Sequence, residues 1–180
     1  MEEAALDLGR LAGERIGEAL EREIVVEYKD ETTTAGGAPT NPVSETDRAI
    51  ETLLREQIAA RFPDHGVVGE EDGGDAEAGR EFVWVLDPVD GTANFVNGFP
   101  LFSSSIGLLH RGRPAVGAIW CSTSHALRPG VYHAREGGPL RFEGAPAPLG
   151  RPRVGVPRPP GPPPRRPPRS RERRGTPDTG

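Results

Sequence analysis

The chain changes character near residue 150, and this change limits the part that can form a folded core. Residues 151–180 contain nine arginines and ten prolines, with only Val154 and Val156 as sizeable apolar residues. Such a segment buries too little apolar surface to offset the entropy of ordering, so we expect disorder or polyproline-like conformations. The sequence therefore predicts a folded domain over residues 1–149 and a low-complexity, Pro/Arg-rich disordered tail over residues 150–180. A shift of reading frame in a GC-rich gene would also produce such a tail.

Charge divides the chain at the same place. The tail carries a net charge of +7, whereas residues 1–150 hold 25 acidic and 13 basic residues, a net charge of −12. A nucleic-acid-binding domain neutralises phosphates with clustered Lys and Arg, so the acidic part argues against that class of partner. It favours a protein that collects cations. Nucleic-acid binding through the tail stays open as a further hypothesis, which predicts salt-dependent association.

The remaining composition indicates a compartment. The single cysteine, Cys121, excludes an internal disulfide and favours a reducing environment. The first seven residues are acidic where a signal peptide is basic and then apolar, and no apolar run approaches the ~20 residues that span a membrane. We expect a cytoplasmic protein without a membrane partner.

Two segments have the periodicity of amphipathic helices. Apolar residues recur every three or four positions over residues 2–22. A second helix is predicted to begin after the capping residue Ser44, with Asp47 in its first turn, and to end near Phe62. Between them, residues 32–42 lose this periodicity and predict a mobile loop.

The segment after the second helix has the pattern of strands. Short apolar runs bounded by turn residues are typical of buried strands. The fold class is therefore α+β, with two helices packed on a largely antiparallel sheet. The expected strands are 67–68, 82–86, 103–109, 115–120, 131–134 and 140–142.

The most informative motif follows the run 82–86, which we expect to end at Asp87. Asp87 and Asp90 lie three residues apart around a proline with a fixed φ angle, so the strand end holds both carboxylates. Gly91 permits a backbone geometry that a Cβ forbids, and Thr92 can open a short helix whose free amides bind phosphate. Two carboxylates beside a phosphate site indicate a hard, oxygen-ligated cation, most simply Mg²⁺.

An upstream motif supplies more oxygen ligands. Gly69-Glu70-Glu71 follows the expected strand 67–68. If that strand neighbours the strand before Asp87, Glu70 can reach the same ion, and the carbonyl of Val89 can add a neutral oxygen. Such a site favours two or more ions.

Together the two motifs resemble the inositol monophosphatase family, in which Gly-Glu-Glu precedes Asp-Pro-(Ile/Val)-Asp-Gly-Thr. The likeness covers roughly residues 2–149, apart from a longer loop near residues 32–41. It implies the N-terminal half of that family's layered fold. It also implies a Mg²⁺-dependent phosphatase that hydrolyses a small phosphomonoester, such as inositol monophosphate, to an alcohol and inorganic phosphate. In the family, homodimers are common.

The resemblance also implies a ligand set for the metal. Glu70 and Asp87, with the carbonyl of Val89, would hold the first ion. Asp87 and Asp90 would hold the second, in a site for two or three Mg²⁺ ions.

Catalytic and phosphate-binding roles follow from the same resemblance. Asp47 and Thr92 would position the attacking water, with Glu70 as a further catalytic residue. Asp90, Gly91 and Thr92 would contact the phosphate.

One departure from the family pattern limits these expectations. Family members continue into a second half, where a Trp-Asp-x-Ala motif supplies another aspartate and neighbouring residues hold the alcohol. Here Trp84 precedes Val85 and Trp120 precedes Cys121. We therefore expect a truncated chain with weak metal binding and little or no turnover, and the sequence does not identify the alcohol. The alternative hypothesis is a non-catalytic metal-binding or interaction remnant.

Overall fold

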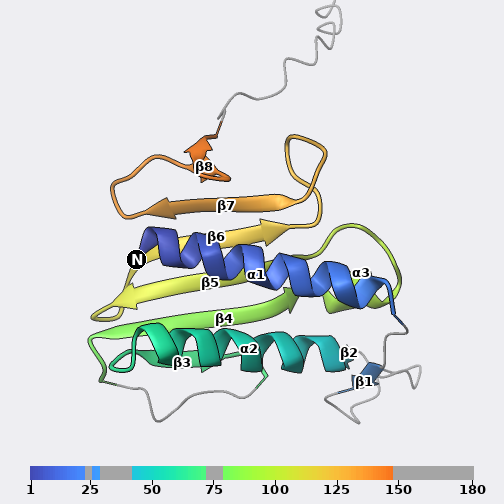
Figure 1. The fold of residues 1–180 in the computed structure, drawn as a ribbon, viewed down its shortest axis with the longest axis horizontal. Helices are drawn as coiled ribbons and strands as arrows, with labels where there is room; N and C mark the ends of the chain where they lie inside the picture. The colour runs from blue at the N-terminus through green and yellow to red at the C-terminus, as the bar shows by residue number, and fades with distance from the viewer. Residues whose placement is uncertain (23–25, 29–41, 72–78, 148–180) are drawn as a thin grey trace, which may run out of the picture. The chain divides into compact units, whose positions relative to one another are not determined.

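The computed structural model describes residues 1–22, 26–28, 42–71 and 79–147. The described residues form three helices and two separate sheets, whose arrangement can be followed in Figure 1. The helices are α1 (Glu2–Leu20), α2 (Glu45–Arg61) and α3 (Thr92–Val96). The strands are β1 (Val26–Tyr28), β2 (Pro42–Ser44), β3 (Gly66–Gly69), β4 (Phe82–Asp90), β5 (Ser103–His110), β6 (Arg113–Cys121), β7 (Gly130–Arg135), β8 (Arg141–Phe142) and β9 (Ala145–Pro146).

Seven of the strands form one sheet in the order β3-β4-β5-β6-β7-β8-β9. The β3–β4 pair is parallel, and every other pair in the sheet is antiparallel. Strands β1 and β2 form a separate antiparallel pair. The predicted α+β class and the largely antiparallel sheet are therefore confirmed.

Both long helices cover the same face of the sheet (Figure 1). Helix α1 packs against β5, β6 and β7, and α2 packs against β3 and β4. Helix α1 lies very close to the sheet because it presents glycine there: a Cβ on Gly13 would be 2.1 Å from Nε1 of Trp120. The largest fully buried apolar side chains between these layers are Trp84, Phe95, Leu8, Ile16, Ile50, Leu54, Ile58, Ile106, Leu108 and Val89.

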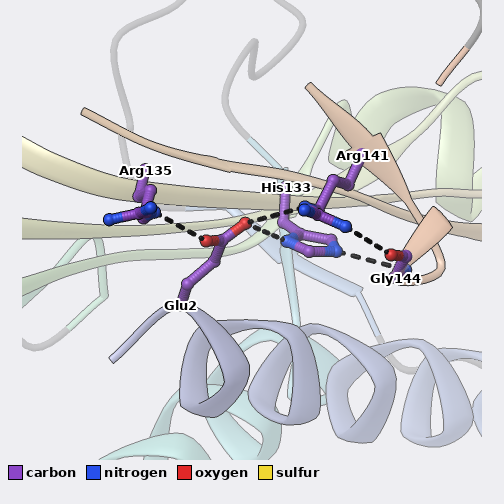
Figure 2. Close-up of polar contacts among 5 residues, drawn as sticks. All are labelled: Glu2, His133, Arg135, Arg141 and Gly144. Carbon is purple, nitrogen blue, oxygen red and sulfur yellow. Dashed lines mark hydrogen bonds and ion pairs between the residues drawn. The ribbon is translucent and has the colours of Figure 1, made fainter. Parts of the chain in front are cut away.

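A partly buried polar contact, the Glu2–His133 pair, fixes the start of α1 on the sheet (Figure 2). The Gly144 N–H donates to Nε2 of His133 at 3.2 Å, so Nδ1 carries the ring proton and donates to Oε1 of Glu2 at 2.8 Å. Arg135 and Arg141 also approach the Glu2 carboxylate, at 3.6 and 4.0 Å. His133 is only 4% exposed, and both of its ring nitrogens are paired.

The structure corrects several predicted bounds. The strand expected to end at Asp87 is longer, because β4 resumes pairing at Asp90 after an irregularity. Strands β5 and β6 extend beyond the expected bounds of 109 and 115 and meet at a tight turn, where the φ angles of Arg111 and Gly112, 52° and 76°, suit a hairpin. Strands β1, β2 and β9 were not predicted.

Some predictions fall outside the described residues. These are most of the mobile loop over residues 32–42, the capping side chain of Ser44 and the disordered tail. The domain boundary at 149/150 likewise stays a prediction. None of the helices described is long and apolar enough to cross a membrane.

Candidate active site

The parallel pairing of β3 with β4 brings the two acidic motifs together. Gly69 is the register partner of Leu86, and the Glu70 N–H donates to the Leu86 carbonyl at 3.1 Å. Strand β3 ends at Gly69, so the next residue, Glu70, lies beside Asp87 of β4. The expectation that these two strands are neighbours is confirmed.

The irregularity at the end of β4 sets the spacing of its two carboxylates. Asp87 pairs with Ser105 and Asp90 with Ser103, so β4 has one more residue than β5 between these pairs. Such a bulge bends a strand and is tolerated here because Pro88 has no N–H to pair. The Ser103 hydroxyl donates to Oδ2 of Asp90 at 3.2 Å.

The turn after β4 places Thr92 against α2. Gly91 has φ 86°, in the left-handed region that favours glycine, and α3 begins at the next residue. The Thr92 hydroxyl lies 3.1 Å from Oδ1 of Asp47 and 2.9 Å from the Val89 carbonyl. Asp47 is 2% exposed. The structure thus brings together two residues separated by 45 positions in the sequence, as the predicted dyad requires.

Asp87 lies at the electrostatic centre of this region. Its pKa is raised to about 7, first by burial, then by the charges of Glu70 and Asp90, by a hydrogen bond with Glu70 and by the charge of Asp47. Its Oδ1 is buried without a hydrogen-bond partner, and it is the only side-chain atom in this state among the described residues. A carboxylate oxygen removed from water with no donor is costly unless a cation binds it.

The donor set is suitable for Mg²⁺. Glu70, Asp87 and Asp90 supply carboxylate oxygens, and Val89 can add its carbonyl. Within the described residues, no three His, Cys, Asp or Glu side chains converge as a complete metal cage. Mg²⁺ does not need one, because it keeps several waters and often takes only one or two protein carboxylates.

Sequence reasoning missed one residue beside this region. Glu51 is fully buried on α2, and its Oε2 accepts a hydrogen bond from the Glu71 N–H at 2.8 Å. One feature of the sequence could have identified Glu51: it is a charged residue one turn after Asp47, next to Ile50 in the apolar stripe of the helix.

Known proteins resemble this chain in sequence and in fold. The "Fructose-1,6-bisphosphatase/inositol-1-monophosphatase" of Aquifex aeolicus is 47% identical over 78 residues, which are 43% of this chain and 29% of that protein. The solved structure of the Thermotoga maritima IMPase has a TM-score of 0.65 at 28% identity, covering 81% of this chain and 52% of that one. An IMPase/NADP phosphatase complexed with Mg²⁺ and phosphate shares the fold, with a TM-score of 0.62 at 21% identity over 77% of this chain and 48% of that one.

The chain thus spans about half the length, or less, of these proteins. The family match, in contrast, covers most of the chain, because residues 1–156 match the inositol monophosphatase family. The paired strand-end motifs, the helix-on-sheet fold and this match agree. The chain belongs to the inositol monophosphatase family.

Proposed function

We propose that this chain derives from a Mg²⁺-dependent phosphatase that hydrolyses a small phosphomonoester, such as inositol monophosphate, to an alcohol and inorganic phosphate. The observation that carries the proposal is the buried, unpartnered oxygen of Asp87. It lies among carboxylates whose charges raise the pKa of Asp87. Close by, Thr92 contacts the buried Asp47.

In this proposal Glu70, Asp87 and the Val89 carbonyl would hold one Mg²⁺. Asp87 and Asp90 would hold a second, and the same acidic groups are compatible with a third. When bound, Mg²⁺ would supply positive charge to offset the phosphate charge and the charge that develops on water and on the leaving oxygen. The carboxylates supply the negative charge that concentrates the ions. Ser103 holds Asp90 in place through its hydroxyl.

The remaining residues orient the reactants. Asp47 accepts a hydrogen bond from the Thr92 hydroxyl, whose oxygen can then accept one from the attacking water. The amide of Gly91 and the hydroxyl of Thr92 lie at the turn that would face the phosphate, and Asp90 flanks it. Glu70 contributes as an acidic group next to the reacting water.

Activity of this chain is expected to be low, because the matched segment is about half of its relatives' length. The same fact favours a second candidate function, a metal-binding or interaction protein without turnover. The first proposal also includes homodimer formation, which the family resemblance implies. It includes a cytoplasmic location as well, which the single cysteine favours.

A phosphate-release assay on the full chain with Mg²⁺ tests the proposal, using inositol 1-phosphate, fructose 1,6-bisphosphate and histidinol phosphate. We expect slow hydrolysis that Asp87→Asn abolishes, with the exposed-helix variant Glu18→Gln as a matched control that leaves it unchanged. Mg²⁺ binding by calorimetry without hydrolysis would favour the second candidate. If the wild-type chain neither binds Mg²⁺ nor releases phosphate, the phosphatase proposal is wrong.

A further inference from the structure

A buried carboxylate of α2, that of Glu51, contacts the acidic turn that carries Glu70. Glu51 is 0% exposed, and its Oε2 accepts the Glu71 N–H at 2.8 Å. Its Oε1 is 2.9 Å from Nε and Nη2 of Arg55. Arg55 in turn donates to the Val67 carbonyl at 3.3 Å. The Glu51 carboxylate thus binds the Arg55 guanidinium on the same helix and also the backbone of the turn after β3.

The backbone of the turn is shaped to admit this carboxylate. A Cβ on Gly69 would be 1.9 Å from Oε1 of Glu51, a distance that no real contact allows. Gly69 is therefore required by the close approach of Glu51, because its φ angle is not in the left-handed region.

Glu70 lies between these two contacts. Gly69 packs against the Glu51 carboxylate, Glu71 donates its N–H to the same carboxylate, and Glu70 donates its own N–H to Leu86 of β4. The backbone on each side of Glu70 is held by Glu51, and Glu70 itself is held by the strand that leads to Asp87. A side-chain hydrogen bond joins Glu70 to Asp87.

We propose that Glu51 is a positioning residue, which fixes the Gly69–Glu71 turn so that Glu70 faces Asp87. This inference rests on the proposed Mg²⁺-dependent function, in which Glu70 is a metal ligand. Asp47 lies one turn earlier on α2 and contacts Thr92. Helix α2 therefore sets the relative placement of the water-orienting residues and of the Glu70 ligand.

A purely structural role for Glu51 makes a different prediction. Breaking a buried ion pair destabilises a fold wherever it lies. Under that interpretation, losing Arg55 and losing the Glu51 acceptor would have the same consequences. Under the positioning interpretation, only the loss of the acceptor oxygen releases the turn.

The test compares three variants of the full chain. Glu51→Gln keeps an oxygen that can accept the Glu71 N–H, Glu51→Met keeps the length but has no acceptor, and Arg55→Met removes the cation alone. The readouts are hydrogen exchange of the Glu71 amide by NMR without metal, Mg²⁺ affinity by calorimetry and the melting temperature. Partners that orient a metal ligand typically contribute about 10–100-fold in metal affinity.

For Glu51→Met we expect exchange of the Glu71 amide to be faster by about tenfold or more, and Mg²⁺ affinity lower by about 10–100-fold. Glu51→Gln should restore both to near the wild-type values. Arg55→Met should lower the melting temperature while leaving the Glu71 amide protected. If Glu51→Met fails to fold, the Glu51→Gln and Arg55→Met pair still decides the question, because only the positioning role predicts a protected Glu71 amide in both.

Unchanged exchange and Mg²⁺ affinity in Glu51→Met would overturn the inference. Equal losses of Mg²⁺ affinity in Arg55→Met and Glu51→Met would also overturn it, in favour of a structural ion pair. If the wild-type chain binds no Mg²⁺, the proposed function is contradicted. Loss of Glu71 amide protection in Glu51→Met would in that case still support the role of Glu51 in fixing the turn.

Discussion

Polar groups in two places on the sheet have opposite surroundings: one place is β7 under the start of α1, and the other is the end of β4. At the first place, the Glu2 carboxylate faces the His133 ring and two arginines (Figure 2). At the second place, Asp87 faces Glu70, Asp90 and Asp47, and one of its oxygens has no partner. The contacts at the first place lower the free energy of the folded chain, whereas the second place retains an electrostatic cost that a cation can relieve.

The strand order keeps these two places apart. Asp87 lies on β4 and His133 lies on β7, with β5 and β6 between them. Along the strands the offset is small, because the register places His133 level with Leu86. Because two strands lie between them, changes at one place should leave the other almost unaffected, since distant sites act additively.

The largest expected effect comes from Asp87→Asn. Losing the carboxylate shared by both proposed ions should reduce Mg²⁺ affinity by about a hundredfold or more, since even partners of metal ligands contribute 10–100-fold. Without metal, the same variant should melt at a higher temperature than wild type, because it removes one of several like charges. Calorimetry and thermal melts measure the two effects. A lower melting temperature without metal would contradict the proposed repulsion.

At the first place, under the start of α1, Glu2→Ala should reduce stability without affecting Mg²⁺ binding. It leaves the buried Nδ1–H of His133 without an acceptor, at a cost of about 1–3 kcal/mol. The melting temperature should fall by about 3–8 °C. Glu2→Gln retains an acceptor oxygen and serves as the matched control with a smaller loss. A change in Mg²⁺ affinity would show that the two places are coupled.

A smaller, pH-dependent effect is expected from His65, which lies before β3. The Trp84 indole N–H donates to its Nδ1 at 3.0 Å, and burial lowers the pKa of His65 more than the charge of Asp64 raises it. A lowered pKa means that the neutral ring is favoured in the folded chain. The neutral His65 ring therefore contributes fully to the stability of the fold above pH 6.5. This contribution is lost as the pH falls through the lowered folded-state pKa.

Because His65 is partly exposed, screening limits this loss to a decrease of about 1–3 °C in melting temperature between pH 7 and pH 5. The difference between wild type and His65→Gln isolates it, since glutamine accepts the Trp84 bond at every pH. Identical pH profiles for the two proteins would exclude the effect.

The smallest effect is expected at a surface ion pair. Arg15 and Glu18 are 2.7 Å apart on α1, but their side chains are 46% and 50% exposed. Arg15→Ala should change the free energy of unfolding by less than about 0.5 kcal/mol. Chemical denaturation measures this. A loss comparable to that of Glu2→Ala would mean that burial does not explain the difference between these pairs.

Much of the fold follows from local patterns. The three-to-four-residue spacing of apolar positions predicted both long helices, and the short apolar runs predicted every strand of the large sheet except β9. The end of β4 was wrong, because a bulge that resumes pairing at Asp90 depends on β5, not on the residues before it. Strand β9 consists of two exposed residues and has no apolar pattern to reveal it.

The predicted site residues divide in the same way. Glu70, Asp87, Asp90 and Thr92 stand in compact motifs, so the sequence alone identified them as candidates. Glu51 has no such motif, because its importance comes from the close approach of α2 to the turn after β3. Its contact with Glu71 spans 20 residues.

The sequence by itself determined the periodicity of the helices and strands, the family, and which side chains carry the chemistry. These properties depend on residue type and short spacing. Only the tertiary structure decided which partly buried carboxylates are paired. Glu2 meets His133 across 131 residues, whereas Asp87 is surrounded by other acids. The physical reason is that the free energy of a buried charge depends on its neighbours in space, and the sheet register and helix packing choose those neighbours.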